Sequence, residues 1–372
     1  LNDWYRITLH RVVEIAREVS SKYTRSKVRR FLPKDFAYII EELLHEQPSE
    51  PNKQEYYAGI IRSIIETRRS EEFIKAICQL IHHLVIDSLH IIGDVYDRGP
   101  GACAIMDTLC NYHDFDIQWG NHDISWMGAA AGNLALIANV VRISIRYMNV
   151  ETLEEGYSIN LLPLATFAID TYGDDPCEHF QVREFENNSR MEQSMQMMAK
   201  MHKAISIIQF KLEGQIIKRH PEYVMEDRRL LHLIDYERGV ITIAGKEYPL
   251  VDTKFPTVDP AHPYSLSNEE RKLMEQLFHS FTCSERLQKH LRCLYQHGSL
   301  FLKRNNNLLY HAAIPLNDDG TFRRVKIDDE EYSGRQLLER IDRIIRDAYF
   351  ADAGSETRQR ALDYMWYLWC GP

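Results

Sequence analysis

Two polar clusters within residues 89–123 hold the side chains best suited to chemistry. The first, residues 93–99, reads GDVYDRG, and the second, residues 120–123, reads GNHD. Each follows a short apolar run, and a helical pattern separates them. This order predicts a strand–loop–helix–strand–loop unit of a parallel sheet. Ligands of such sheets bind at the carboxyl ends of the strands, where both clusters are expected.

The residue types in these clusters fit metal-assisted hydrolysis of a phosphate ester. Asp94 and Asn121 offer hard oxygen donors suited to Mn, Fe, Zn or Mg. Arg98 carries a fixed fork of donors that matches a phosphate. His122 can give a proton to a leaving alkoxide, and Asp97 can fix its tautomer and raise its pKa. The set therefore predicts two-metal hydrolysis of a phosphate ester.

Each cluster also has a purely structural interpretation. An Asp-x-x-Asp-Arg-Gly stretch can be a solvated turn, and Asn-His-Asp can cap a helix. Both clusters together, each after a predicted strand and one βα unit apart, favour the functional interpretation. Gly93 and Gly120 would let the backbone turn sharply beneath the site.

The two motifs resemble those of the calcineurin-like metallophosphoesterases. The wider sequence is similar to one family within them, the class III fructose-1,6-bisphosphatases of Firmicutes and some other bacteria, over essentially the whole chain. Further resembling segments lie at residues 3–6 (DWYR), 20–27 (SSKYTRSK), 32–38 (LPKDFAY), 209–215 (QFKLEGQ) and 309–311 (LYH).

The resemblance implies a substrate, a cofactor and a set of roles. The reaction would be hydrolysis of the 1-phosphate of fructose 1,6-bisphosphate, giving fructose 6-phosphate and phosphate in gluconeogenesis, in the cytoplasm. A binuclear Mn²⁺ site is implied. Asp94 would bridge the two ions, and Asn121 and His311 would bind one each. Arg98 would hold the phosphate, and His122 would protonate the leaving oxygen.

His311 stands at the end of a predicted strand, residues 307–310. The resembling superfamily has a metal-binding His-Gly-Gly motif in this setting, whereas this chain reads His311-Ala312-Ala313. A lone His after a strand is usually structural. Its order after the two other motifs favours the ligand role, so His311 is expected close to Asp94.

Two metal motifs of the superfamily have no counterpart. An Asp-x-His motif is not found before Asp94, and His297-Gly298 is the reverse of the expected Gly-His pair. The ligand set for two metals is therefore incomplete. We expect this chain to be an internal fragment that is inactive by itself.

The expected fold is α/β, a calcineurin-like metallophosphoesterase core with large helical insertions. The expected segments are 1–84, helical; 85–130, first part of the core; 131–300, mostly helical with a small hairpin near 240–251; 301–330, core continued; and 331–372, helical. Single helices are expected over 124–148 and from a capping box at 267–270 to about 297. A basic cluster is interpreted as surface charge: Lys211, Lys218, Arg219 and His220.

Composition limits the function classes. The chain has 372 residues, 44% of them hydrophobic and 27% charged, which is enough to bury a large core. Its net charge of −9 argues against general nucleic-acid binding. No apolar run reaches the ~20 residues of a membrane span. The seven scattered cysteines indicate reduced thiols. The expected partner is a sugar bisphosphate, and a homo-oligomer is compatible with the sequence.

Two alternatives stay open at this point. A protein Ser/Thr phosphatase or a dinucleoside polyphosphate hydrolase could share the same core, although large helical insertions would be unusual for either. A non-catalytic helical scaffold could also keep a relic of the site, and the missing metal motifs favour that hypothesis.

Overall fold

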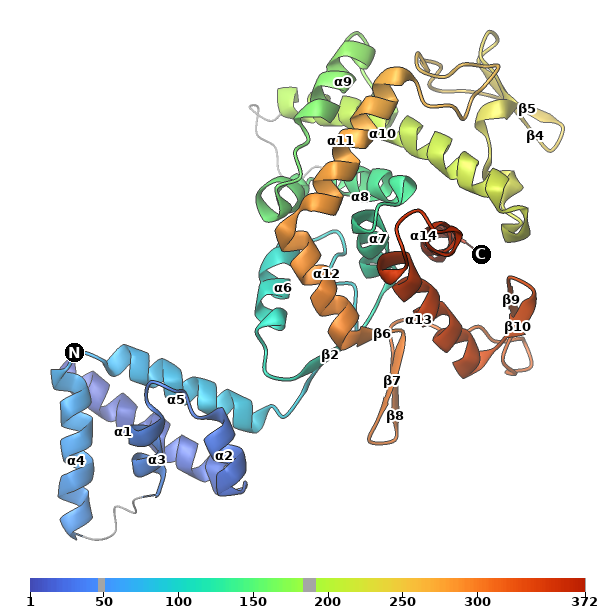
Figure 1. Cartoon of the computed structure of the whole chain (residues 1–372). Helices are drawn as coiled ribbons and strands as arrows, with labels where there is room; N and C mark the ends of the chain where they lie inside the picture. The colour runs from blue at the N-terminus through green and yellow to red at the C-terminus, as the bar shows by residue number, and fades with distance from the viewer. Residues whose placement is uncertain (46–50, 183–191, 372) are drawn as a thin grey trace. The chain divides into compact units, whose positions relative to one another are not determined.

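The computed structural model describes residues 1–45, 51–182 and 192–371. Within them the chain divides into two compact units (Figure 1). The first unit comprises residues 1–90 and 113–115, and the second comprises residues 91–112 and 116–372. All the predicted site residues belong to the second unit.

The first unit is built from helices that share one apolar core. They are α1 (Asn2–Ser20), α2 (Arg25–Phe31), α3 (Ala37–His45), α4 (Pro51–Glu66) and α5 (Ser70–Val85). Leu9, Val13 and Ala16 of α1 are fully buried, and their spacing of four and three residues places them on one helix face. Phe73 and Leu80 of α5 join the same core.

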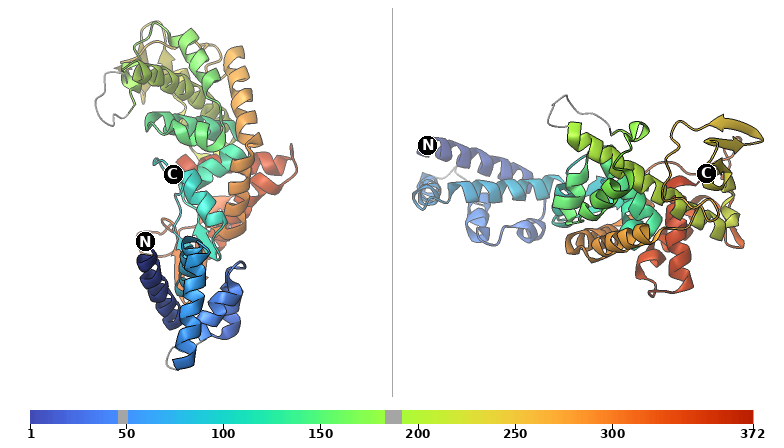
Figure 2. Two further views of the ribbon diagram at one scale, coloured as in Figure 1. Left: turned by 90° about the vertical axis from the view of Figure 1, so that its left-hand side faces the viewer. Right: turned by 90° about the horizontal axis from the view of Figure 1, so that it is seen from above.

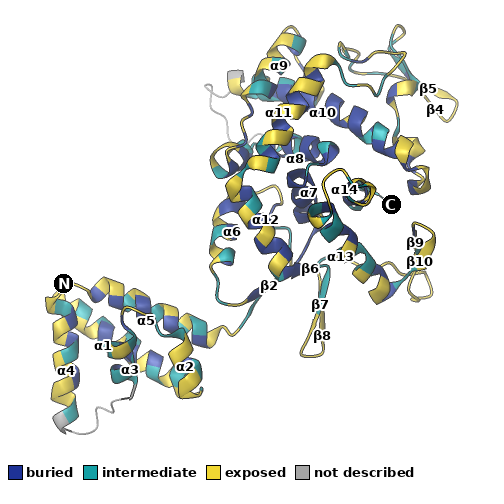
Figure 3. Cartoon of the chain, viewed as in Figure 1, coloured by how far each residue is buried: buried dark blue, intermediate teal, exposed yellow. Residues whose placement is uncertain are grey.

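Helices also make up most of the second unit. They are α6 (Ala102–Cys110), α7 (Asn121–Ala130), α8 (Leu134–Arg146), α9 (Leu162–Tyr172), α10 (Glu192–Arg219), α11 (Asn268–Cys283), α12 (Glu285–His297), α13 (Gly334–Phe350) and α14 (Glu356–Cys370). Shorter helical turns lie at Thr152–Gly156, Glu178–Phe180, Pro221–Tyr223, Glu226–Arg228 and Leu231–Leu233. α7 and α8 form the buried centre (Figure 3), and α10 packs along α8 (Figure 2).

A small parallel sheet supports the two polar clusters. Its strands are β1 (Leu89–Ile91), β2 (Phe115–Gln118) and β6 (Gly298–Ser299), in the order β1-β2-β6. β2 and β6 run parallel, with Ile117 opposite Gly298. The mixed α/β class is therefore confirmed, and this sheet is small compared with the helices around it.

The other strands form separate antiparallel sheets. They are β3 (Ile234–Asp235), β4 (Val240–Ile243) and β5 (Lys246–Pro249) in one sheet, β7 (Phe301–Arg304) with β8 (Asn307–Tyr310), and β9 (Val325–Ile327) with β10 (Glu330–Tyr332). β8 is the strand predicted to end at His311. It pairs with β7 in a hairpin and lies outside the β1-β2-β6 sheet.

Two helices expected to be continuous are each broken. The prediction of one helix over 124–148 is wrong, because Gly132 adopts a φ of +103° between α7 and α8. Asn133 then starts α8, and its Oδ1 accepts a hydrogen bond from Leu136 N at 3.0 Å. The capping box of Ser267 and Glu270 is confirmed at the start of α11. That helix ends at Cys283, since Ser284 is extended and caps α12.

The interpretation of the basic cluster as surface charge is wrong for two of its members. Lys211 is fully buried, and its Nζ lies 2.7 Å from Glu270 and donates to the carbonyl of Thr257. His220 is also buried. Lys218 and Arg219 are exposed, as expected. A buried lysine needs such a pairing because an isolated charge would be costly to desolvate.

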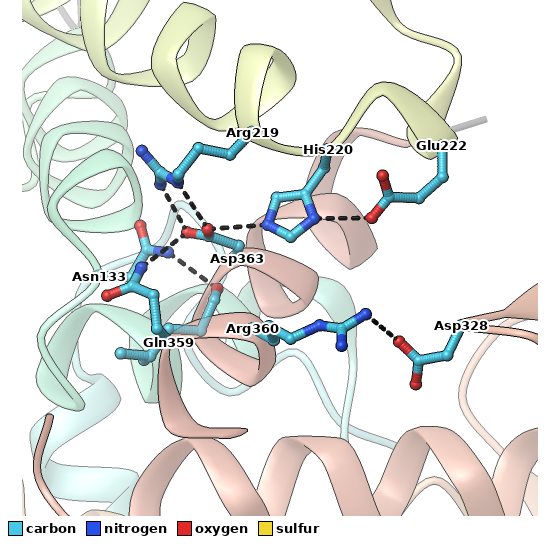
Figure 4. A network of polar contacts seen from close by, with 9 residues as sticks. Asn133, Arg219, His220, Glu222, Asp328, Gln359, Arg360 and Asp363 are labelled. Atoms are coloured by element: carbon cyan, nitrogen blue, oxygen red, sulfur yellow. Dashed lines mark hydrogen bonds and ion pairs between the residues drawn. The ribbon is translucent and has the colours of Figure 1, made fainter. Parts of the chain in front are cut away.

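His220 joins α10 to α14 through a polar network centred on the buried Asp363 (Figure 4). Its Nε2 lies 3.0 Å from Asp363 of α14, and its Nδ1 lies 2.8 Å from Glu222. Arg219 donates two hydrogen bonds to the same Asp363 carboxylate, at 3.0 and 3.1 Å. Asp363 is 1% exposed, so the network fixes α14 against α10.

This network is expected to make the chain's stability depend on pH. Burial lowers the pKa of His220, but the hydrogen bonds to Asp363 and Glu222 outweigh burial and raise the pKa above 6.5. The stabilisation is therefore fully present below pH 6.5 and is lost as pH rises through the folded-state pKa. It is also lost in acid, because the pKa of Asp363 lies below its ordinary 3.8.

The check is chemical denaturation of the chain between pH 5.5 and 8.5. His220→Gln should reduce the free energy of unfolding at pH 5.5 by roughly 1.5–3 kcal/mol, the scale of a hydrogen bond to a charged group. His220→Gln should also reduce the decline of the free energy of unfolding as the pH rises. His279→Gln, at an exposed position of α11, is the control. An unchanged pH profile in His220→Gln would contradict the prediction.

Among the described residues, no helix is both long and apolar enough to cross a membrane.

Candidate metal and phosphate site

Gly93 brings the loop after β1 against the end of β2. Its φ of +90° is readily adopted by glycine, and Asp94 follows with a φ of +54°. A Cβ on Gly93 would lie 2.2 Å from the carbonyl oxygen of Gln118 and 2.7 Å from the backbone nitrogen of Gly120. The two polar clusters therefore meet, as the predicted parallel unit requires.

Asp123 joins the two clusters through backbone hydrogen bonds. Its Oδ2 accepts from Asp94 N at 2.7 Å and from Gly120 N at 2.9 Å, and its Oδ1 accepts from Tyr96 N at 3.3 Å. Burial raises the pKa of Asp123 to about 6, although these three donors oppose the rise. This carboxyl group holds the Asp94 loop against the N-terminus of α7.

The structure brings Asp94 and His311 together. Asp94 Oδ2 lies 3.1 Å from His311 Nε2, and Asp94 Oδ1 accepts from the backbone N–H of His122 at 3.1 Å. His311 Nδ1 contacts the carbonyl oxygen of Ile92. A carbonyl oxygen can only accept, so Nδ1 carries a proton, and Nε2 is the ring nitrogen that faces Asp94. The expected proximity of His311 and Asp94 is confirmed.

His122 and Asp97 form the second contact of the site. His122 Nε2 lies 3.0 Å from Asp97 Oδ1. Burial lowers the pKa of His122, and the nearby carboxylates of Asp97 and Asp94 oppose this. Asp97 does raise the pKa of His122, as expected. Burial has the larger effect, so the net pKa is lowered. The rings of His122 and Trp369 pack edge to face, with centroids 5.0 Å apart.

These side chains make a donor set that fits a divalent cation. One ligand atom each from Asp94, Asp97 and His122 lie within 4.8 Å of one another. His311 Nε2 adds a fourth donor beside Asp94. Carboxylate and imidazole donors of this kind suit Mn, Fe or Zn.

Comparison with known proteins identifies the family. A family model described as Firmicute fructose-1,6-bisphosphatase matches residues 1–372. The chain belongs to this family. Relatives named fructose-1,6-bisphosphatase class 3 from Bacteroides thetaiotaomicron, Clostridium novyi and Porphyromonas gingivalis are 60%, 57% and 54% identical to it. The matches cover all of this chain and 56–57% of each relative, so the chain spans a little over half of their length. No solved structure matches it.

In this fructose-1,6-bisphosphatase family member, Arg98 and Asn121 lie beside the donor set. Arg98 is half-exposed, with its Nε 3.4 Å from Asp97 Oδ1 and its guanidinium over the ring of Tyr147. Asn121 is the exposed first residue of α7, next to His122. Arg98 is therefore open to a phosphate, and Asn121 lies at the same helix end as His122.

Two residues of this family member's site were not predicted from the sequence. Asp123 belongs to the GNHD cluster, and its position in the first turn of a helix is a known sign of backbone capping. Trp369 lies about 250 residues after His122, and local sequence signals do not reveal such contacts.

Proposed function

We propose that the whole protein hydrolyses the 1-phosphate of fructose 1,6-bisphosphate, giving fructose 6-phosphate in gluconeogenesis. The supporting observation is the convergence of Asp94, His122 and His311 in a chain of the Firmicute fructose-1,6-bisphosphatase family. Family membership does not favour the protein phosphatase, the dinucleoside polyphosphate hydrolase or the non-catalytic scaffold. The names of the relatives support the choice of substrate.

Each site residue has a proposed role. Asp94 would bridge two Mn²⁺ ions, and Asn121 and His311 would bind one each. The ions, when bound, would activate water and offset phosphate charge. Arg98 would hold the phosphate. His122 would protonate the leaving oxygen.

Asp97 would orient His122 for this proton transfer. Asp97 Oδ1 lies 3.0 Å from His122 Nε2, so a ring protonated on both nitrogens would keep its Nε2–H on Asp97 and give its Nδ1 proton to the leaving oxygen.

We also propose that residues 85–130 and 301–330 form a calcineurin-like core, and that residues 1–84, 131–300 and 331–372 are the helical segments of the chain. The cytoplasm is the proposed compartment, since the described cysteines are all free thiols.

The test is phosphate release from fructose 1,6-bisphosphate in the presence of Mn²⁺. The whole protein should show metal-dependent turnover and yield fructose 6-phosphate. This chain alone should be silent, because its ligands leave the second ion nearly without protein donors. Lack of turnover by the whole protein would overturn the proposed substrate. Robust turnover by the chain alone would show that it holds a complete ligand set.

Arg98→Ala in the whole protein should mainly weaken phosphate binding. Removing one charged hydrogen-bond partner typically costs about 1.5–3 kcal/mol, so KM should rise roughly 10- to 100-fold with a smaller change in kcat. Steady-state kinetics provide the measurement. Arg343→Ala, an exposed arginine of α13, is the control. A change confined to kcat would contradict the phosphate role.

A further inference from the structure

A buried hydrogen-bonded chain starts at Tyr96, between the two aspartates of the site loop. Tyr96 Oη lies 2.8 Å from Tyr157 Oη, which lies 3.0 Å from His290 Nδ1. His290 Nε2 lies 2.9 Å from Asp107 Oδ1. Tyr96, Tyr157 and His290 are each at most 2% exposed. Three buried side chains and the partly exposed Asp107 carboxylate are thus joined within the second unit.

The protons of this chain have one consistent arrangement. Hydrogen bonds from Arg286 and His290 lower the pKa of Asp107, so its carboxylate accepts. Burial lowers the pKa of His290, which favours the neutral ring, with its proton on Nε2. Nδ1 then accepts from Tyr157 O–H, and Tyr157 accepts from Tyr96 O–H. Burial raises the pKa of both tyrosines, so each keeps the proton that it donates.

The chain closes on the backbone segment that carries two site residues. Asp107 lies in α6, eleven residues after Tyr96, so the bonds connect the two ends of segment 96–107. Asp97 and Arg98 lie within this segment. Gly99 is also held, because Asn149 Nδ2 donates to its carbonyl at 2.9 Å. The segment is therefore held at Tyr96, at Gly99 and, inside α6, at Asp107.

Tyr157 is itself held firmly. The hydroxyl of Ser284, the N-cap of α12, donates to Tyr157 O at 2.7 Å. Arg286 donates to the carbonyl of Gly156 at 2.9 Å and also pairs with Asp107. Ser284 and Arg286, at the start of α12, thus hold both Tyr157 and Asp107.

We infer that Tyr157, His290 and Asp107 are positioning residues that act through Tyr96 to fix Asp97 and Arg98. They touch no substrate. They restrict the loop on which the orienting carboxylate of His122 and the phosphate-binding guanidinium lie. Their effect on turnover rests on the proposed function, whereas their effect on the loop does not.

Tyr157→Phe is the diagnostic change, because it removes only the hydroxyl that joins Tyr96 to His290. The matched control is Tyr295→Phe, which removes a buried hydroxyl that donates to the carbonyl of Ile345 at 3.3 Å. Hydrogen–deuterium exchange of the chain, followed by mass spectrometry, measures the loop directly. We expect exchange in segment 96–107 to rise at least severalfold in Tyr157→Phe and to stay unchanged in Tyr295→Phe.

Kinetics of the whole protein provide the second measurement. Tyr157→Phe should lower kcat/KM for fructose 1,6-bisphosphate on the order of 10- to 100-fold, the scale for outer partners of metal sites. Tyr295→Phe should not. Equal exchange of segment 96–107 in the two variants, or faster exchange with unchanged kcat/KM, would overturn the inference. If exchange rises selectively but the unsubstituted protein does not hydrolyse this substrate, the proposed function fails and the restraint of the loop stands.

Discussion

Replacing His122 by alanine in the whole protein is expected to lower kcat for fructose 1,6-bisphosphate by roughly 10²–10⁴, the usual contribution of general acid catalysis. The leaving group of a sugar phosphate is an alkoxide, which needs a proton as it departs. His122 is the imidazole of the donor cluster whose Nε2 is held by Asp97. His122 is also buried, with 5% of its surface exposed.

The same variant separates two roles for His122. Its imidazole lies within 4.8 Å of the oxygens of Asp94 and Asp97 and could itself be a metal ligand. A proton donor can be removed without loss of metal, whereas removal of a ligand lowers Mn²⁺ content. We expect His122→Ala to retain its Mn²⁺, measured by elemental analysis alongside kcat.

The control is His279→Ala, at an exposed position on α11. It should retain full activity. Activity on a substrate with a better leaving group, such as p-nitrophenyl phosphate, should fall much less in His122→Ala. The reason is that a departing phenolate needs little protonation. Equal losses on both substrates, or loss of Mn²⁺, would show that His122 is not the acid.

The sequence predicts the site where a few neighbouring residues determine the local structure. GNHD follows an apolar run, so a helix is expected after it, from residue 124. The helix α7 begins three residues earlier, at Asn121, where Asp123 accepts a hydrogen bond from the backbone N–H of Gly120. The strand before His311 can also be predicted, because residues 307–310 carry their own pattern. Its partner β7 cannot, since the choice between a hairpin and the central sheet depends on tertiary packing.

Features set by distant partners could not be predicted. The sequence around Lys211 indicates a surface charge. In the fold Lys211 is buried, because it pairs with Glu270, 59 residues later. His290 reads as an ordinary helical residue, and only the fold brings it to Asp107, 183 residues away. The break between α7 and α8 depends on the backbone conformation of one glycine in an alanine-rich stretch. Composition and periodicity carry no signal for such contacts.

The second large effect is expected for Gly120→Ala. The backbone there has a φ of −85°, which any residue adopts, so the added methyl acts by its volume alone. The new Cβ would lie 2.0 Å from Asp94 Oδ1 and 2.8 Å from His311 Cε1. Atoms cannot remain at these distances, and the two proposed ligands must move.

The movement should disable the site while the fold survives. Asp94 Oδ1 lies at the end of a short side chain, so displacing it is easier than displacing the buried backbone of α7. Its hydrogen bond from His122 N and its contact with His311 both depend on the present position. A misplacement of about 1 Å typically costs roughly 10²-fold in rate. We expect kcat of the whole protein to fall by about this factor, and its affinity for Mn²⁺ to fall as well.

Gly99→Ala is the matched control, because a Cβ at that position meets nothing within 4 Å. Calorimetric titration with Mn²⁺ should show weaker binding for Gly120→Ala and unchanged binding for Gly99→Ala. Circular dichroism should show the same helix content in both variants. If Gly120→Ala binds Mn²⁺ as tightly as Gly99→Ala, then Asp94 and His311 are not ligands. The close approach of Gly120 to them would then serve packing alone.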